Sequence, residues 1–153
     1  MRISEALHGV MRLGVDASAL IDLIDSVPRS AQAWRGVLSR TQAGDLVLVS
    51  SSVLLVEVIA TGDDMAIEAS RVEAALSRLE MVDLGQEIAR LAASMRRDYG
   101  LETPDAIHIA TALAARCEAF LTADRDFLRV SGYPLPWAPS RTLKIIVAQE
   151  LSA

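Results

Sequence analysis

Short apolar runs of strand length alternate along this chain with longer segments in which apolar residues recur at helical spacing. The runs are too short for ordinary helices, and Gly, Ser or Asp residues bound them, which indicates buried strands. We predict strands at residues 12–15, 45–49, 81–84, 119–122, 133–135 and 143–147. Strands that alternate with helices form parallel sheets, because a parallel pair needs a crossover connection. The predicted fold class is therefore α/β, with a central, mostly parallel sheet flanked by helices.

Helices are predicted between these strands, and Gly or Pro residues mark several of their ends. Gly100 follows one predicted helix, and Pro104 stands at the first position of another, with Thr103 as its cap. Asp22 and Asp25 are interpreted as exposed charges on the first helix. The predicted helices cover residues 18–26, 31–43, 53–61, 65–78, 86–99 and 104–116, with a short helix near Phe127.

The length of 153 residues and the composition predict one domain over residues 1–153. No internal repeat or linker marks a boundary. Cys117 is the single cysteine, so no internal disulfide can form, which favours a reducing compartment. The N-terminal residues lack an apolar run of signal-peptide length, and no uncharged run approaches membrane-spanning length. We therefore expect a soluble cytoplasmic protein.

The net charge of −5 is unfavourable for nucleic-acid binding when it is taken as an average over the surface. A carboxylate metal site, however, contributes negative charges that its own metal ions neutralise. The cations are nearly all arginine, and Lys144 is the only lysine. Arginine suits phosphate, but base bias of the genome also explains this composition.

Two predicted strands lead into aspartate, since Asp16 follows residues 12–15 directly and Asp124 lies just past residues 119–122. In open parallel sheets the ligand site lies beyond the carboxyl ends of the strands, where the strand order switches. An aspartate between a strand and a helix is also among the commonest helix caps. Taken alone, each of these residues is better explained as a cap.

Glu57 is the only charged residue in the predicted helix VLLVEVIA. A helix that is apolar on nearly all sides is largely buried, and a lone carboxylate there is destabilising unless it is paired or binds a metal. The alternative is a narrow solvent-facing edge of this helix. Asp105 stands in the first turn of its helix, where the helix dipole favours a negative charge whatever its function. His108 lies on the same face and is interpreted as a partly exposed structural histidine that borders the site or donates to Asp105.

Four motifs occur in a fixed order along the chain: VDASALI at Asp16, SSSVLLVEVIATG at Glu57, TPDAIHIATAL at Asp105 and FLTADRDF at Asp124. With these motifs the sequence resembles the PIN-domain nucleases, especially the VapC-type toxins of bacterial toxin-antitoxin pairs. The resemblance extends from about residue 13 to residue 133, and PDAIHIATAL followed by LTADRDF is its most specific part. It implies a three-layer PIN-like fold in which the sheet brings Asp16, Glu57, Asp105 and Asp124 together, with Ser18 or Thr122 in support.

The sequence departs from the family pattern at three places. About ten residues precede the usual start of the first strand, and His108 stands where an aliphatic residue is common. Asp126 is a less regular fifth acid and competes with Asp124 for the fourth role. These departures concern the termini and the details of the metal-binding residues.

The resemblance implies a metal-dependent endoribonuclease with Asp16, Glu57, Asp105 and Asp124 as its catalytic and metal-binding residues. Carboxylates are hard oxygen ligands, so Mg²⁺ or Mn²⁺ is the expected cofactor. The ion would activate water for attack on a phosphodiester and stabilise the leaving oxygen. Arg125 or Arg29 is a candidate phosphate contact, although a solvated surface role explains both. The implied partners are RNA, a cognate antitoxin and a second copy in a homodimer, with no membrane.

Other functions remain open at this point. A response-regulator receiver needs an acidic pair after the first strand, where Asp16 stands alone, and a dehalogenase-type phosphatase needs an aspartate in place of Ser18. Both are therefore disfavoured. A catalytically silent PIN-like binding module is the main alternative, and a housekeeping or DNA-directed PIN nuclease is another.

Overall fold

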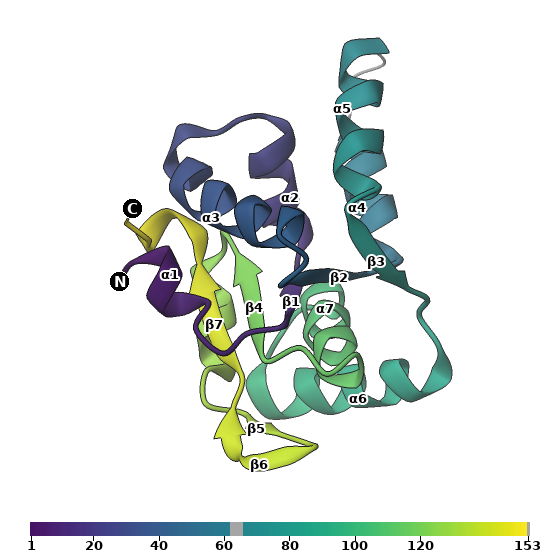
Figure 1. Ribbon diagram of the computed structural model, residues 1–153. Coiled ribbons are helices and arrows are strands. Elements are labelled where there is room, and N and C mark those ends of the chain that lie inside the picture. The colour runs from purple at the N-terminus through teal and green to yellow at the C-terminus, as the bar shows by residue number, and fades with distance from the viewer. Residues whose placement is uncertain (62–65, 153) are drawn as a thin grey trace.

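The computed structural model describes residues 1–61 and 66–152, and in this part of the chain the centre is a five-stranded parallel sheet in the order β3-β2-β1-β4-β7 (Figure 1). The chain first builds β1, β2 and β3 outward and then places β4 on the other side of β1. The strand order therefore switches between β1 and β4. The strands are β1 Arg12–Val15, β2 Val47–Ser51, β3 Leu79–Val82, β4 Ala119–Thr122 and β7 Lys144–Val147.

Helices cover both faces of this sheet, so the predicted three-layer α/β fold is confirmed (Figure 1). Leu13 and Val15 pack into one core cluster, while Val49 and Phe120 pack into the other, because successive side chains of a strand point to opposite faces. The first face carries α1 Ile3–Ala6, α2 Ala17–Ile24 and α3 Ala31–Gln42, and the second carries α6 Gln86–Tyr99 and α7 Thr103–Ala114. Between β2 and β3 the chain forms α4 Val53–Thr61 and α5 Ala66–Leu76.

Gly14 allows α7 to lie close against β1. A Cβ atom at this position would stand 2.8 Å from the Ala112 Cβ and 2.8 Å from the Phe120 Cδ1, which is shorter than carbon atoms approach without displacement. The absence of a side chain at Gly14 thus sets the distance between the sheet and the helix that carries Asp105 and His108.

Several predicted elements are confirmed within one or two residues, among them β1, β4, α3, α4 and α6, which ends at Gly100 with φ +68°. The predicted start of the next helix at Met65 lies outside the described residues. Thr103 begins α7 but does not cap it, since the N-cap residue is Glu102. The short helix near Phe127 is the 3-10 helix η2, Arg125–Val130, and further 3-10 helices are η1 Pro28–Ser30 and η3 Ala148–Glu150.

The predicted strands at 45–49 and 81–84 are each displaced by two residues. β2 continues through Ser50 and Ser51, which pair in register with Met81 and Val82 of β3. Both serines are buried, and Ser50 Oγ donates to the Val15 carbonyl at 2.7 Å. A neighbouring strand thus provides partners for polar side chains that a local pattern assigns to a loop.

Near the C-terminus, the predicted strand at 133–135 does not join the main sheet. Pro134–Leu135 forms β5, which pairs antiparallel with β6, Ala138–Thr142, a strand that the apolar pattern did not indicate. The termini meet beside β7, where Ile3 N donates to the Ser152 carbonyl at 3.2 Å (Figure 1). α1 was also not predicted. No helix within residues 1–61 and 66–152 has the length and apolar character that a membrane crossing needs.

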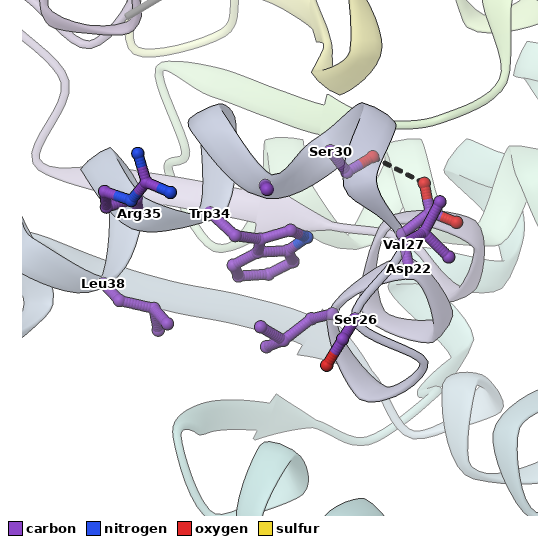
Figure 2. Close-up of a pocket in the computed structure, with 9 residues that line it drawn as sticks. Asp22, Ser26, Val27, Ser30, Trp34, Arg35 and Leu38 are labelled. Carbon is purple, nitrogen blue, oxygen red and sulfur yellow. Dashed lines mark hydrogen bonds between the residues drawn. The ribbon is translucent and has the colours of Figure 1, made fainter.

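The interpretation of Asp22 as an exposed charge is wrong, because its carboxylate is buried between α2 and η1. Ser30 Oγ donates to Asp22 Oδ2 at 2.5 Å, and Arg29 donates to the same carboxylate at 3.1 and 3.2 Å. Figure 2 shows the Ser30 bond at one end of a pocket of about 240 Å³, whose floor is the Trp34 indole. Asp25, the C-cap residue that follows α2, is exposed as predicted.

Candidate acidic active site

Three of the four predicted site residues lie on segments that follow central strands, and the fourth, Asp105, lies at the start of α7. Asp16 comes directly after β1, and Asp124 comes two residues after the end of β4. β1 and β4 are neighbours in register, with Val15 opposite Leu121, so both aspartates leave the sheet at the point where the strand order switches. Glu57 lies on α4 beyond β2, and Asp105 lies in the first turn of α7.

Asp16 is buried, and three groups donate hydrogen bonds to its carboxylate. Its carboxylate accepts hydrogen bonds from Ala19 N at 3.0 Å, from Thr122 Oγ1 at 2.7 Å and from Ser18 Oγ at 2.9 Å. Burial raises the pKa of Asp16, and these three bonds lower it by less. Asp16 thus caps α2, as the pattern suggested, and its carboxylate is also fixed at the end of β1.

Ser18 and Thr122 also hold the loop after β4 against Asp16. Ala123 N donates to Ser18 Oγ at 3.0 Å, and Asp124 N donates to Thr122 Oγ1 at 3.0 Å. The two hydroxyls therefore connect the end of β4 to the carboxylate at the end of β1. This is the supporting position that the family resemblance implied for them.

Asp124 and Asp126 differ in their surroundings. Asp124 is half-buried, and its Oδ1 accepts from Asp126 N at 2.9 Å, so it caps η2. Asp126 is exposed. Repulsion from Asp124 raises the pKa of Asp105, whereas Asp126 is not among the charges that shift it.

The carboxylate of Asp105 lies within electrostatic range of those of Asp16 and Asp124. Its pKa is raised to about 6, chiefly by burial and further by repulsion from Asp124 and Asp16, while His108 acts to lower it. The carboxylate of Asp105 is half-buried. A cation placed among these carboxylates would relieve the repulsion, because an opposite charge stabilises the ionised form.

Glu57 reaches the site through a partner on α7. Its Oε1 lies 2.6 Å from His108 Nε2, and its side chain is 33% exposed. The prediction that α4 is largely buried is wrong for one side, since Val56 and Ile59 are 70% and 61% exposed. The interpretation of His108 as partly exposed is also wrong, because it is 3% exposed and contacts Glu57.

Sequence reasoning did not identify Gln149, which follows β7. Its Nε2 donates to the Ala123 carbonyl at 2.9 Å, so it holds the same loop that Ser18 holds. A glutamine in the polar segment after a strand carries no local signal of such a contact. The two arginines named as candidate phosphate contacts are exposed and ion-paired, Arg29 with Asp22 and Arg125 with Glu150.

The donor set fits a divalent ion such as Mg²⁺ by its chemistry. Within residues 1–61 and 66–152, no group of three or more Asp, Glu, His or Cys side chains is placed so that it could hold a metal ion. Mg²⁺, however, usually keeps several waters and is bound through one or two carboxylates together with substrate phosphates. The mutual repulsion that raises the pKa of Asp105 is what such an ion would neutralise.

Comparisons with known proteins support the fold. A toxin-antitoxin complex from Klebsiella pneumoniae is similar, with a TM-score of 0.59 and 28% identity over 76% of this chain and 89% of that chain. VapBC2 from Rickettsia felis bound to a DNA fragment from their promoter has a TM-score of 0.65 and 17% identity over 88% and 98% of the two chains. DNA-bound VapBC from Salmonella typhimurium has a TM-score of 0.60 and 18% identity over 88% and 96%. At these identities the last two show the fold alone.

No curated protein matches this sequence. The family model of the PIN domain matches residues 14–133, which is well over half of the chain and contains all four predicted acids. PIN domains are generally nucleases, so this match supports a nuclease activity. The chain belongs to the PIN domain family.

Proposed function

We propose that this protein is a metal-dependent endoribonuclease that hydrolyses RNA phosphodiester bonds and acts as the toxin of a type II toxin-antitoxin pair. Besides the family membership, one observation supports the proposal. Burial, Asp124 and Asp16 together raise the pKa of Asp105 to about 6, at the end of the sheet where parallel folds bind their ligands. Such a cluster of repelling carboxylates suits a cation better than it suits a stable metal-free core.

In this proposal Asp16 and Asp105 are the main ligands of Mg²⁺ or Mn²⁺. Asp124 is the fourth acid, and Glu57 is a ligand or positions the attacking water. When bound, the ion supplies charge stabilisation at the phosphodiester and lowers the pKa of a coordinated water. The chain itself supplies the fixed geometry, since Ser18, Thr122 and the Ala19 amide hold Asp16 in place.

The proposed partner is a cognate antitoxin, in line with the likeness to the toxin-antitoxin complex of Klebsiella pneumoniae. We propose that a flexible segment of the antitoxin places an arginine or lysine in the acidic site. A guanidinium bonds two carboxylate oxygens at once and would replace the charge of the metal. Residues 1–153 would act as one nuclease domain within a homodimer.

The test is a pair of isosteric substitutions that remove charge and keep shape. Asp105→Asn and Asp16→Asn should each abolish Mn²⁺-dependent cleavage of a labelled RNA, while far-ultraviolet circular dichroism stays unchanged. Asp25→Asn is the matched control, because Asp25 is an exposed aspartate directly after α2, and its activity should equal that of the parent. Asp22 is unsuitable as a control because its carboxylate is buried.

The alternatives give different results in the same assay. Cleavage that persists in both variants removes these carboxylates from the active site. Cleavage of single-stranded DNA in preference to RNA identifies a DNA-directed nuclease. A parent protein that binds no Mn²⁺ and cleaves neither substrate is a catalytically silent PIN-like module.

A further inference from the structure

His108 is a histidine in the most deeply buried stretch of α7. Residues 106–113 of this helix are all buried, and the neighbours Ile107 and Ile109 are apolar. His108 Nε2 lies 2.6 Å from Glu57 Oε1, and Nδ1 is buried without a hydrogen-bond partner among the described residues. Its ring thus has one polar atom satisfied by a proposed active-site residue and one left unsatisfied.

The unsatisfied nitrogen makes a purely structural role difficult to explain. A buried polar atom without a partner destabilises the fold, whereas an apolar side chain of similar size fills the same space without that penalty. An unsatisfied buried group in a native fold calls for an explanation, and a role at a functional site is one such explanation. A leucine at position 108 would serve the packing of α7 at least as well.

The bond to Glu57 supplies such a functional reason. Leu54 and Val58 anchor one side of α4 in the core, while Val56 and Ile59 face solvent, so Glu57 lies at the boundary with its side chain one-third exposed. A glutamate at a boundary has several rotamers within reach. The contact with His108 ties its carboxylate to the helix that also carries Asp105, one turn away.

The location of His108 among the acids agrees with this role. Its charge lowers the pKa values of both Asp16 and Asp105, so the ring lies within electrostatic range of the carboxylates at the ends of β1 and α7. The bond between His108 and Glu57 thus lies within electrostatic range of two other acids of the candidate site, Asp16 and Asp105.

We propose that His108 is a positioning residue that fixes the Glu57 carboxylate in the acidic site for metal binding and RNA cleavage. The proposal rests on the proposed function. It makes Glu57 and His108 one unit, in which the imidazole N–H orients the carboxylate as outer residues orient the ligands of metal sites. It also assigns a role to a residue that does not itself contact the metal or the RNA.

The experiment compares His108→Leu, which removes the bond, with His108→Gln, whose side-chain amide can restore an N–H near the position of Nε2. His8→Leu is the matched control, because His8 is exposed and is the only other histidine of the chain. Three quantities are measured for each protein: Mn²⁺ affinity by calorimetry without RNA, kcat and KM on a labelled RNA, and the metal-free Tm.

His108→Leu should weaken Mn²⁺ binding and lower kcat by about 10- to 100-fold, with a smaller change in KM. Its metal-free Tm should equal or exceed that of the parent, because an unsatisfied buried nitrogen is removed. His108→Gln should recover most of the loss. In a Glu57→Gln background, His108→Leu should produce little further loss, because the two residues act together.

Other results overturn the proposal in distinguishable ways. Parent-like Mn²⁺ affinity and kcat in His108→Leu would remove His108 from any positioning role while leaving the proposed function intact. A Tm that falls in step with activity, with no recovery in His108→Gln, would assign His108 to packing alone. A parent protein that neither binds Mn²⁺ nor cleaves RNA would overturn the proposed function itself, and the positioning role with it.

Discussion

Removal of the buried Asp22 carboxylate should destabilise the protein far more than removal of an exposed one. In Asp22→Ala the Ser30 hydroxyl, which is fully buried, loses its acceptor at 2.5 Å. Loss of a buried hydrogen bond to a charged group is worth about 1.5–3 kcal/mol. The Arg29 side chain is 57% exposed, so solvent screens its ion pair with Asp22 and the pair adds little to this loss. The expected loss in the free energy of unfolding is therefore about 1.5–3 kcal/mol.

Urea denaturation followed by circular dichroism measures this loss, and Asp25→Ala, at the residue that follows α2, is the control. Asp25 is exposed, so its substitution should change the free energy of unfolding by less than about 0.5 kcal/mol. In a double-mutant cycle Asp22→Ala and Ser30→Ala should be non-additive, since both remove one bond. A loss in Asp22→Ala no larger than in Asp25→Ala, or full additivity with Ser30→Ala, would refute the reasoning.

Three further predictions concern the site and the sheet beneath it. Because the pKa of Asp105 in the folded state is raised to about 6, the folded state holds more protons than the unfolded state between about pH 4 and 6, and stability falls as pH rises through this window. In metal-free protein, the Tm gain of Asp105→Asn over the parent should therefore be larger at pH 7 than at pH 5, and an equal gain would contradict the raised pKa. In thermal melts, millimolar Mn²⁺ should raise the Tm of the parent, because an ion bound only to the folded state stabilises it, and should raise the Tm of Asp16→Asn less. An unchanged melting curve of the parent would favour a catalytically silent module. Gly14→Ala should lower the free energy of unfolding by roughly 1–3 kcal/mol, measured in urea, since its Cβ would meet Ala112 and Phe120 at 2.8 Å, and a neutral result would mean that α7 can move away from β1.

The elements that could be predicted from the sequence are those whose signals are local. β1 and β4 are short, mostly apolar runs, and Gly100 ends α6 because its φ of +68° suits a residue without a side chain. The placement of Asp16 and Asp124 beyond neighbouring strands followed from the α/β pattern together with the family resemblance. The order of β1 and β4 in the sheet is what makes these two positions adjacent.

The parts that could not be predicted depend on partners far away in the sequence. Ser50 belongs to a strand because its hydroxyl finds the Val15 carbonyl, and Asp22 is buried because Ser30 and Arg29 of η1 satisfy it. Periodicity treats serine and aspartate as surface residues and contains no information about such partners. The same limit applies to His108, whose partner Glu57 lies 51 residues away.

Helix capping and a role in the acidic site are compatible for Asp16 and Asp124. Asp16 caps α2 and Asp124 caps η2, so capping alone would explain both residues. A cap, however, requires neither burial of Asp16 nor a half-buried Asp105 that both other aspartates repel. The raised pKa values of Asp16 and Asp105 mean that the folded metal-free state opposes their ionised forms. A fold shaped for stability alone would place neutral side chains at these positions, and in the proposed function a bound cation would remove this opposition.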